Sequence, residues 1–201
     1  MNKRNHKMSK RINLVGISGS LRRGSYNTAL LKAAKQALPE DMEMTLVSID
    51  ALPLYNGDLD GDNQPGAIRQ FRNALAMADG FVFASPEYNY SIPGTLKNAI
   101  DWASRPPNSP LAGKPVALMG ASMGTIGTAR MQIAFRPVFQ CLDMTPVNRP
   151  EVLVPQAHKL FDSEGKLTDE GTFEIVRKKI QALREMVLQQ RTIKELLFTT
   201  N

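Results

Sequence analysis

Residues 85–94 carry the side chains with the clearest chemical potential in this sequence. They include two tyrosines, an asparagine, a glutamate and two prolines, and they follow directly on the apolar run at residues 80–84. Such a run is typical of a strand buried in a parallel sheet, and the ligands of open α/β sheets bind just beyond the carboxyl ends of such strands. Aromatic rings and polar groups at this position favour a planar ligand. The alternative is an ordinary loop whose tyrosines close the top of the core.

The loop at residues 18–28 predicts an anion site. It holds two glycines, four hydroxyl side chains and an arginine, namely Ser18, Gly19, Ser20, Arg22, Gly24, Ser25 and Thr28. Glycines let backbone N–H groups approach a ligand, hydroxyls donate hydrogen bonds, and the amino end of a following helix attracts negative charge. The chain has neither Gly-x-x-x-x-Gly-Lys-Ser/Thr nor Gly-x-Gly-x-x-Gly, so one terminal phosphate is the simplest ligand. Serine-rich turns of this kind also occur without a ligand.

A third turn, at residues 122–127, reads Ser-Met-Gly-Thr-Ile-Gly and follows an apolar run at residues 115–121. Because the carboxyl ends of parallel strands lie along one edge of a sheet, the three loops should converge there. We therefore expect a phosphate pocket, a platform for a planar ring and a wall of small residues to form one site.

The elements that must position these loops alternate along the chain. Strands are expected at residues 12–17, 43–49, 80–85, 115–121 and 151–154, with residues 144–147 as a further contributor to the fifth. Helices are expected at residues 27–38, 65–78 and 93–105, from the small-residue turn to about residue 142, and from residue 168 onward. Pro137 should kink or divide the fourth helix, because it removes a hydrogen bond. This alternation predicts an α/β fold with a parallel sheet and right-handed crossovers.

Composition narrows the class further. A chain of 201 residues suits one α/β domain. The net charge is +6, but residues 1–11 contribute five positive charges without an acid, so nucleic acid is a poor candidate partner. No apolar stretch approaches the roughly 20 residues of a membrane helix, and no signal-peptide core is present, which favours the cytoplasm. The single cysteine, Cys141, lies in an apolar run and is expected to be buried and inert. Residues 162–165 predict a tight turn rather than a metal loop.

Two motifs together resemble those of the NADPH-dependent FMN reductase family, and most closely its quinone and chromate reductases. The first is Gly16-Ile17-Ser18-Gly19-Ser20-Leu21-Arg22 with Ser25 and Asn27. The second is Ser85-Pro86-Glu87-Tyr88-Asn89 followed by Pro93-Gly94-x-Leu96-Lys97-Asn98-Ala99-Ile100-Asp101-Trp102. The resemblance covers about residues 12–190; residues 1–11 are expected to form a basic, disordered tail and residues 191–201 a C-terminal extension. It implies a flavodoxin-like three-layer sandwich with a five-stranded parallel sheet in the order 2-1-3-4-5.

The resemblance also implies which residues bind FMN. The phosphate loop would contribute Ser18, Ser20, Leu21, Arg22, Ser25, Tyr26 and Asn27. The isoalloxazine ring would be lined by Pro86, Glu87, Tyr88, Asn89 and Tyr90, with Ser122 and Gly124 on its far side. Glu87 is expected to have a structural role, because hydride transfer to a flavin needs no strong base. Arg105 and Arg22 are candidate contacts for a phosphate of NADPH.

The implied chemistry belongs to the flavin. NADPH or NADH would give hydride to flavin N5 and leave, and a quinone, chromate or a similar acceptor would then take its place in a ping-pong cycle. A homodimer or homotetramer is implied, and Trp102 would pack either against a partner subunit or at the edge of the core. The alternatives are a flavodoxin-like electron carrier, a flavin-based redox sensor without turnover, and a phosphate-binding scaffold without flavin.

Overall fold

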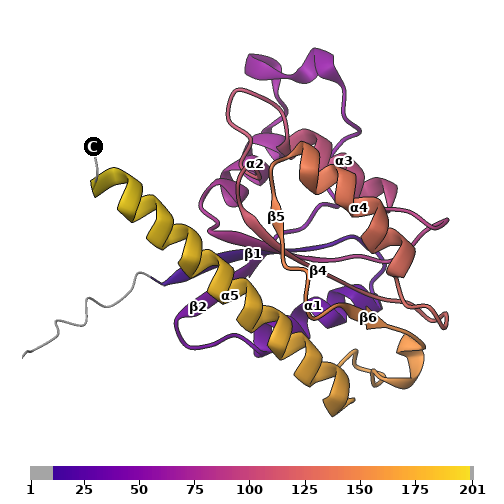
Figure 1. Ribbon diagram of the computed structural model, residues 1–201. Helices are drawn as coiled ribbons and strands as arrows, with labels where there is room; N and C mark the ends of the chain where they lie inside the picture. Colours follow the sequence, from indigo (N-terminus) through magenta and orange to yellow (C-terminus); the bar gives the residue numbers. More distant parts are fainter. Residues whose placement is uncertain (1–10, 200–201) are drawn as a thin grey trace, which may run out of the picture.

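The computed structural model of the protein describes residues 11–199, and a parallel sheet lies at its centre (Figure 1). The strands are β1 (Ile12–Ser18), β2 (Met42–Leu46), β3 (Gly80–Ala84), β4 (Pro115–Ala121), β5 (Thr145–Pro146) and β6 (Val152–Val154). They pair in the order β2-β1-β3-β4-β5, and β6 also pairs with β4. Every pairing is parallel, so the predicted strand order is confirmed.

Two short strands share the fifth position of the sheet. Thr145 of β5 pairs with Pro115 at the start of β4, and Val154 of β6 pairs with Ala121 at its end. Both segments were indicated by the sequence. Pro150 lies between them, and because a proline has no N–H to donate to a ladder, the pairing is interrupted in this part of the chain.

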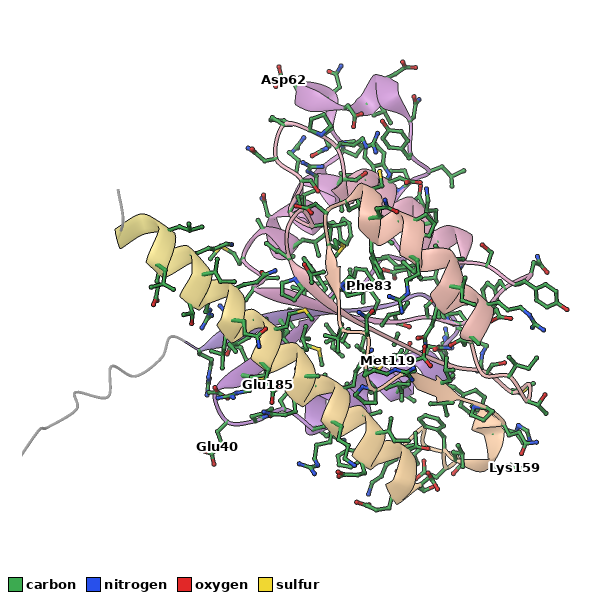
Figure 2. All side chains as sticks on the ribbon, in the orientation of Figure 1. Glu40, Asp62, Phe83, Met119, Lys159 and Glu185 are labelled. Atoms are coloured by element: carbon green, nitrogen blue, oxygen red, sulfur yellow. The ribbon has the colours of Figure 1, made fainter. Side chains whose placement is uncertain are left out.

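Helices cover both faces of the sheet (Figure 1). They are α1 (Tyr26–Gln36), α2 (Gly66–Ala76), α3 (Gly94–Ala103), α4 (Ala129–Cys141) and α5 (Glu170–Thr199). Successive side chains of a strand point to opposite faces, so Val82 of β3 packs with the core under α1 and α5, whereas Phe83 packs with the core under α2, α3 and α4. Figure 2 shows Phe83 and Met119 in the middle of the molecule. The three-layer sandwich is thus confirmed.

The prediction that Cys141 is buried was wrong, because its side chain is exposed. Phe135 and Phe139, four residues apart, form the buried face of α4. Two residues beyond Phe139 a helix has turned by about 200°, which directs Cys141 to solvent. The same helix continues through Pro137, so of the two expected effects of this proline, a kink or a division, the division does not occur.

Trp102 is fully buried by the chain's own loop at residues 52–64. Its Nε1 donates a hydrogen bond to the carbonyl oxygen of Pro53 (2.8 Å), and its ring meets that of Tyr55 edge-on at 4.9 Å between centroids. Asn98 binds the same loop, since its Oδ1 accepts from the N–H of Tyr55 and its Nδ2 donates to Pro53. Of the two interpretations of Trp102, packing at the edge of the core is therefore the correct one.

Helix α5 is a single element of 30 residues. It begins after Asp169, whose carboxylate accepts the N–H of Thr172 (2.7 Å), and it continues past residue 190. Arg191 contacts Asp79 through Nη2 (2.8 Å). The expected boundary at residue 190, where the sequence resemblance ends, therefore lies inside a continuous helix and does not coincide with the end of an element. The expected basic tail lies outside the described residues except for Arg11.

The turn at residues 162–165 is confirmed. Asp162 Oδ1 accepts from the N–H groups of Glu164 and Lys166, and Gly165 has a φ of 78°. No cluster of three or more potential metal ligands occurs within residues 11–199. Within the same range, no helix combines the length and apolar character needed to span a bilayer.

Candidate functional site

A cavity of about 440 Å³ opens at the carboxyl ends of β1, β3 and β4, and we call it the central cavity. Its size lies within the range of about 300–1,000 Å³ that is usual for small-molecule sites. It is lined by Ser20, Arg22, Ser25, Tyr26, Asn27, Pro86, Glu87, Tyr88, Ala121, Ser122 and Met123. All three loops that the sequence singled out thus contribute to one site.

The amino end of α1 forms one end of the central cavity. Ser25 caps the helix, since its Oγ accepts the N–H of Thr28 (3.3 Å). The N–H of Ser25 donates to the carbonyl oxygen of Arg22 (3.1 Å), which closes the loop into a compact turn. The next N–H groups, those of Tyr26 and Asn27, belong to the first turn of the helix, where no intrahelical acceptor exists. Together with the Arg22 guanidinium, they make this end of the cavity suitable for an anion.

The side chain of Asn27, which lines the central cavity, is hydrogen-bonded to the end of β4. It is buried, its Nδ2 donates to the carbonyl oxygen of Ala121 (2.9 Å), and its Oδ1 accepts the N–H of the same residue (2.8 Å). This pair of bonds ties the start of α1 to the end of β4. The side chain of Asn27 therefore fixes the spacing of two walls of the cavity, while its backbone N–H remains at the anion end.

Residues 88–91 form a tight hairpin at the end of the central cavity opposite the amino end of α1, where a planar ring is expected. Tyr88 and Ser91 exchange two backbone hydrogen bonds of 3.2 and 2.9 Å. Between them, Asn89 and Tyr90 have φ values of 49° and 63°, and a two-residue hairpin turn of type I′ requires positive φ at both positions. Tyr88 lines the cavity, whereas Tyr90 lies outside it, with its ring centroid 4.0 Å from the Arg130 guanidinium carbon.

Glu87 binds the amino end of α4. Its Oε2 accepts the N–H groups of Arg130 (3.0 Å) and Met131 (3.1 Å), and its Oε1 pairs with the Arg130 guanidinium (3.3 Å). A carboxylate is favoured at this position by the helix dipole and by the otherwise unpaired N–H groups. These contacts are consistent with the structural role expected for Glu87, which also lines the central cavity.

Close backbone packing under the site depends on Gly120. A Cβ atom at this position would lie 2.2 Å from Thr128 Oγ1 and 2.4 Å from the carbonyl oxygen of Ser85. The glycine therefore lets β4 approach Ser85, the first residue of the loop at residues 85–94, which we call the ring loop. Gly19 lies in a less crowded place, where a Cβ would meet Ser85, Leu96 and Pro86 at 3.0–3.3 Å.

Several predicted site residues do not line the central cavity. Ser18 lies beneath the loop, with its Oγ 2.9 Å from Thr28 Oγ1. Leu21 lines a neighbouring cavity instead. Asn89, Tyr90 and Gly124 belong to the surrounding loops. Conversely, Ala121 and Met123 line the cavity and were missed, although their place at the end of the fourth expected strand was a usable signal.

Arg105 is not brought to the cavity. It follows the carboxyl end of α3, and a helix of ten residues is about 15 Å long, so it is remote from the ring loop that precedes that helix. Its guanidinium carbon lies 5.1 Å from the centroid of the Tyr55 ring, and its Nε donates to the carbonyl oxygen of Asp101 (2.9 Å). The hydroxyl of Tyr55 donates to Asp60 (2.7 Å), and this bond raises the pKa of Tyr55.

Known structures place this arrangement among the flavodoxin-like α/β proteins. The flavoenzyme FerB, an NAD(P)H:(acceptor) oxidoreductase from Paracoccus denitrificans, aligns with a TM-score of 0.80 and 32% identity over 89% of this chain and 98% of FerB. A WrbA-like flavodoxin from Agrobacterium tumefaciens shares the fold with a TM-score of 0.61 and 18% identity, over 89% of this chain and 98% of its own.

The particular family follows from sequence comparison. The model of the NADPH-dependent FMN reductase family matches residues 12–159, and the chain belongs to that family. An NAD(P)H-dependent FMN reductase of Pseudomonas aeruginosa is 47% identical over 92% of this chain and all of its own length. A quinone reductase of Escherichia coli K12 is 39% identical over 90% of this chain and 97% of its own. The resemblance found in the two motifs is thus confirmed.

Proposed function

We propose that this protein is an FMN-dependent NAD(P)H oxidoreductase that reduces quinones. The observation that carries this proposal is a single cavity with anion-binding groups at one end and an aromatic hairpin at the other. FMN has the same two parts, a phosphate and a planar ring, so the residues fit the cofactor. The family match and the names of the relatives support the same activity.

The binding roles divide along the cavity. Ser20, Arg22 and Ser25, with the first N–H groups of α1, would hold the phosphate. Pro86, the backbone of Glu87 and Tyr88 would contact the ring from one side, and the wall from Ala121 to Met123 would contact it from the other. Bound FMN supplies hydride transfer from NAD(P)H to an acceptor through its N5 position.

No side chain of the cavity is required as an acid or a base. Glu87 is the carboxylate on the wall, and both of its oxygens are engaged with α4 and Arg130. The protein's contribution is therefore to orient the ring and to leave a face of it open to reductant and acceptor. An open ring face would also admit chromate, which we propose as a further acceptor.

An electron carrier without turnover is the alternative class. Such carriers are commonly strongly acidic, which draws them to basic partners. This chain has a net charge of +6, five of which come from residues 1–11, so the remainder is close to neutral. The charge pattern therefore favours an enzyme.

We also propose a homodimer or homotetramer. Met123, Ile126 and Ile133 expose at least half of their surface on or near α4, an arrangement that suits contact with another copy. We assign residues 12–190 to the FMN-binding domain, and we propose the cytoplasm as its location, since NAD(P)H and a reduced Cys141 suit that compartment.

The test is the visible spectrum of the purified protein after incubation with FMN, recorded without oxygen before and after NADPH or NADH is added. The proposal predicts a bound flavin spectrum that the reductant bleaches and that a quinone restores. A protein that stays colourless would contradict flavin binding. Bound flavin that neither reductant bleaches would favour the carrier.

A further inference from the structure

A second cavity, of about 330 Å³, lies on the other side of the phosphate loop, and we call it the side cavity. Its walls come from that loop, from α1 and from residues 46–50, which begin at the last residue of β2. Ser20 and Arg22 line both cavities. A molecule that lies over the central cavity can therefore continue past Arg22 into the side cavity.

The side cavity offers apolar surface to a flat group. Leu21 has half of its surface exposed, and Leu46 has 36% exposed. Both line the side cavity, although large apolar side chains are costly to leave in water. An aromatic base that packed against Leu21 and Leu46 would remove this surface from solvent.

The polar groups of the side cavity match a ribose that bears either a hydroxyl or a phosphate. The hydroxyl of Ser48 donates to Asp50 Oδ1, and this bond lowers the pKa of Asp50, so the carboxylate is ionised near neutral pH. The Asp50 carboxylate lines the side cavity, and a carboxylate can accept a hydrogen bond from a ribose hydroxyl. Arg23, an exposed cation, lines the same cavity and could pair with a phosphate.

We propose that the side cavity binds the adenosine portion of the reductant, with Asp50 accepting from the 2′-hydroxyl of NADH and Arg23 pairing with the 2′-phosphate of NADPH. This inference rests on the proposed function and adds a site to it. The nicotinamide would then lie in the central cavity with the flavin, and the remainder of the molecule would cross the phosphate loop beside Arg22, which lines both cavities. Since one cavity holds both a carboxylate and an exposed guanidinium, we expect the enzyme to accept both reductants.

The alternative cation, Arg105, is excluded by its position. It lies beyond the carboxyl end of α3 and stacks on Tyr55. A nucleotide that extends from the central cavity into the side cavity would therefore not reach Arg105. Arg22 packs over the Tyr26 ring, with 5.5 Å between guanidinium carbon and centroid, and it faces both cavities. Arg23 is therefore the residue whose removal should separate the two reductants.

The test is calorimetric binding of 2′,5′-ADP and of 5′-AMP to the FMN-loaded protein and to its Arg23→Ala variant. We expect the substitution to weaken 2′,5′-ADP binding about tenfold, which corresponds to one lost charge-assisted contact, and to change 5′-AMP binding less than about twofold. The KM for NADPH should rise by a similar factor, while the KM for NADH should not. Asp50→Ala should raise the KM for NADH more than that for NADPH.

Lys35→Ala is the matched control, because it removes an exposed cation from α1, the helix that follows the phosphate loop, at a position outside both cavities. Equal changes for both nucleotides in Arg23→Ala, or no change, would overturn the inference. An enzyme that NADPH bleaches but that binds neither fragment would also overturn it, while leaving the proposed function intact. Failure of both reductants to bleach the wild-type flavin would contradict the proposed function itself, and the inference with it.

Discussion

Ser20 and Arg22 lie at the anion end of the central cavity, on a turn that Ser25 closes. Their side chains add a hydroxyl donor and a delocalised cation to the N–H groups of α1. Hydrogen bonds to charged groups contribute about 1.5–3 kcal/mol each. At the scale of single residues, the strength of cofactor binding therefore depends on this turn.

Replacement of both residues, Ser20→Ala with Arg22→Ala, should weaken FMN binding by at least about a hundredfold, because two hydrogen bonds to a charged phosphate are lost. Quenching of FMN fluorescence on titration measures the dissociation constant. Lys35→Ala should leave that constant within about twofold. An unchanged constant in the double variant would show that the phosphate binds elsewhere.

Glu87 allows a prediction that separates a structural role from a catalytic one. Glu87→Gln keeps an oxygen that can accept an N–H at the start of α4, so turnover should stay within about threefold of the wild type and stability should fall slightly. Glu87→Ala removes both acceptors and should lower the free energy of unfolding by about 1–3 kcal/mol. Urea unfolding and steady-state rates measure the two effects. Loss of turnover in a stably folded Glu87→Gln would contradict the structural role.

At the scale of elements, the approach of β4 to the ring loop rests on Gly120. Gly120→Ala would place a methyl group 2.4 Å from the carbonyl oxygen of Ser85, so backbone must shift. We expect a loss of about 1–3 kcal/mol or more in the free energy of unfolding, together with weaker FMN binding. Gly94→Ala is the control, since nothing lies within 4 Å of its Cβ position at the start of α3. Equal stability of the two variants would contradict this account of the packing.

The sequence predicted the elements well because their signals are local. Apolar runs marked β3 and β4, and proline positions marked the start of α3. The misses have long-range or phase-dependent causes. Trp102 is covered by a loop some 50 residues away in sequence, which no helical phase reveals, whereas the exposure of Cys141 follows from the turn of α4 and could have been anticipated.

The site was predictable to a similar degree. Convergence of three loops follows from the parallel order of the strands, and the central cavity confirms it. Which side chains face the ligand depends on local backbone geometry. The side chain of Asn27 bonds to Ala121, and the turn at Asn89 and Tyr90 places the Tyr90 ring over Arg130, and neither arrangement is evident from the sequence.

At the scale of the whole molecule, Lys179 links stability to pH. It lies on α5 with 2% of its surface exposed, and its Nζ donates to the carbonyl oxygen of Val147 (2.6 Å). Burial lowers the pKa of Lys179 to about 8, and the charge of Arg136 adds to this shift while that of Glu151 opposes it. In the unfolded chain a lysine has a pKa of about 10.4.

At a pH between these two pKa values, Lys179 is protonated in the unfolded chain but largely neutral in the folded protein. The free energy of unfolding should therefore rise as the pH increases from about 8 to about 10.4, by up to roughly 3 kcal/mol, and the full penalty should remain below pH 8. Lys179→Met should remove this rise. Urea unfolding of both proteins across the range measures the difference, and identical slopes would contradict a depressed lysine pKa.

We propose that one cavity binds a terminal phosphate at α1 and a flavin ring at the hairpin of residues 88–91. A comparison of the dissociation constants of FMN and riboflavin tests this arrangement, because the two flavins share the ring and differ in the phosphate. FMN should bind at least about a hundredfold more tightly, since several charge-assisted contacts depend on the phosphate. Equal affinity for the two flavins would contradict it.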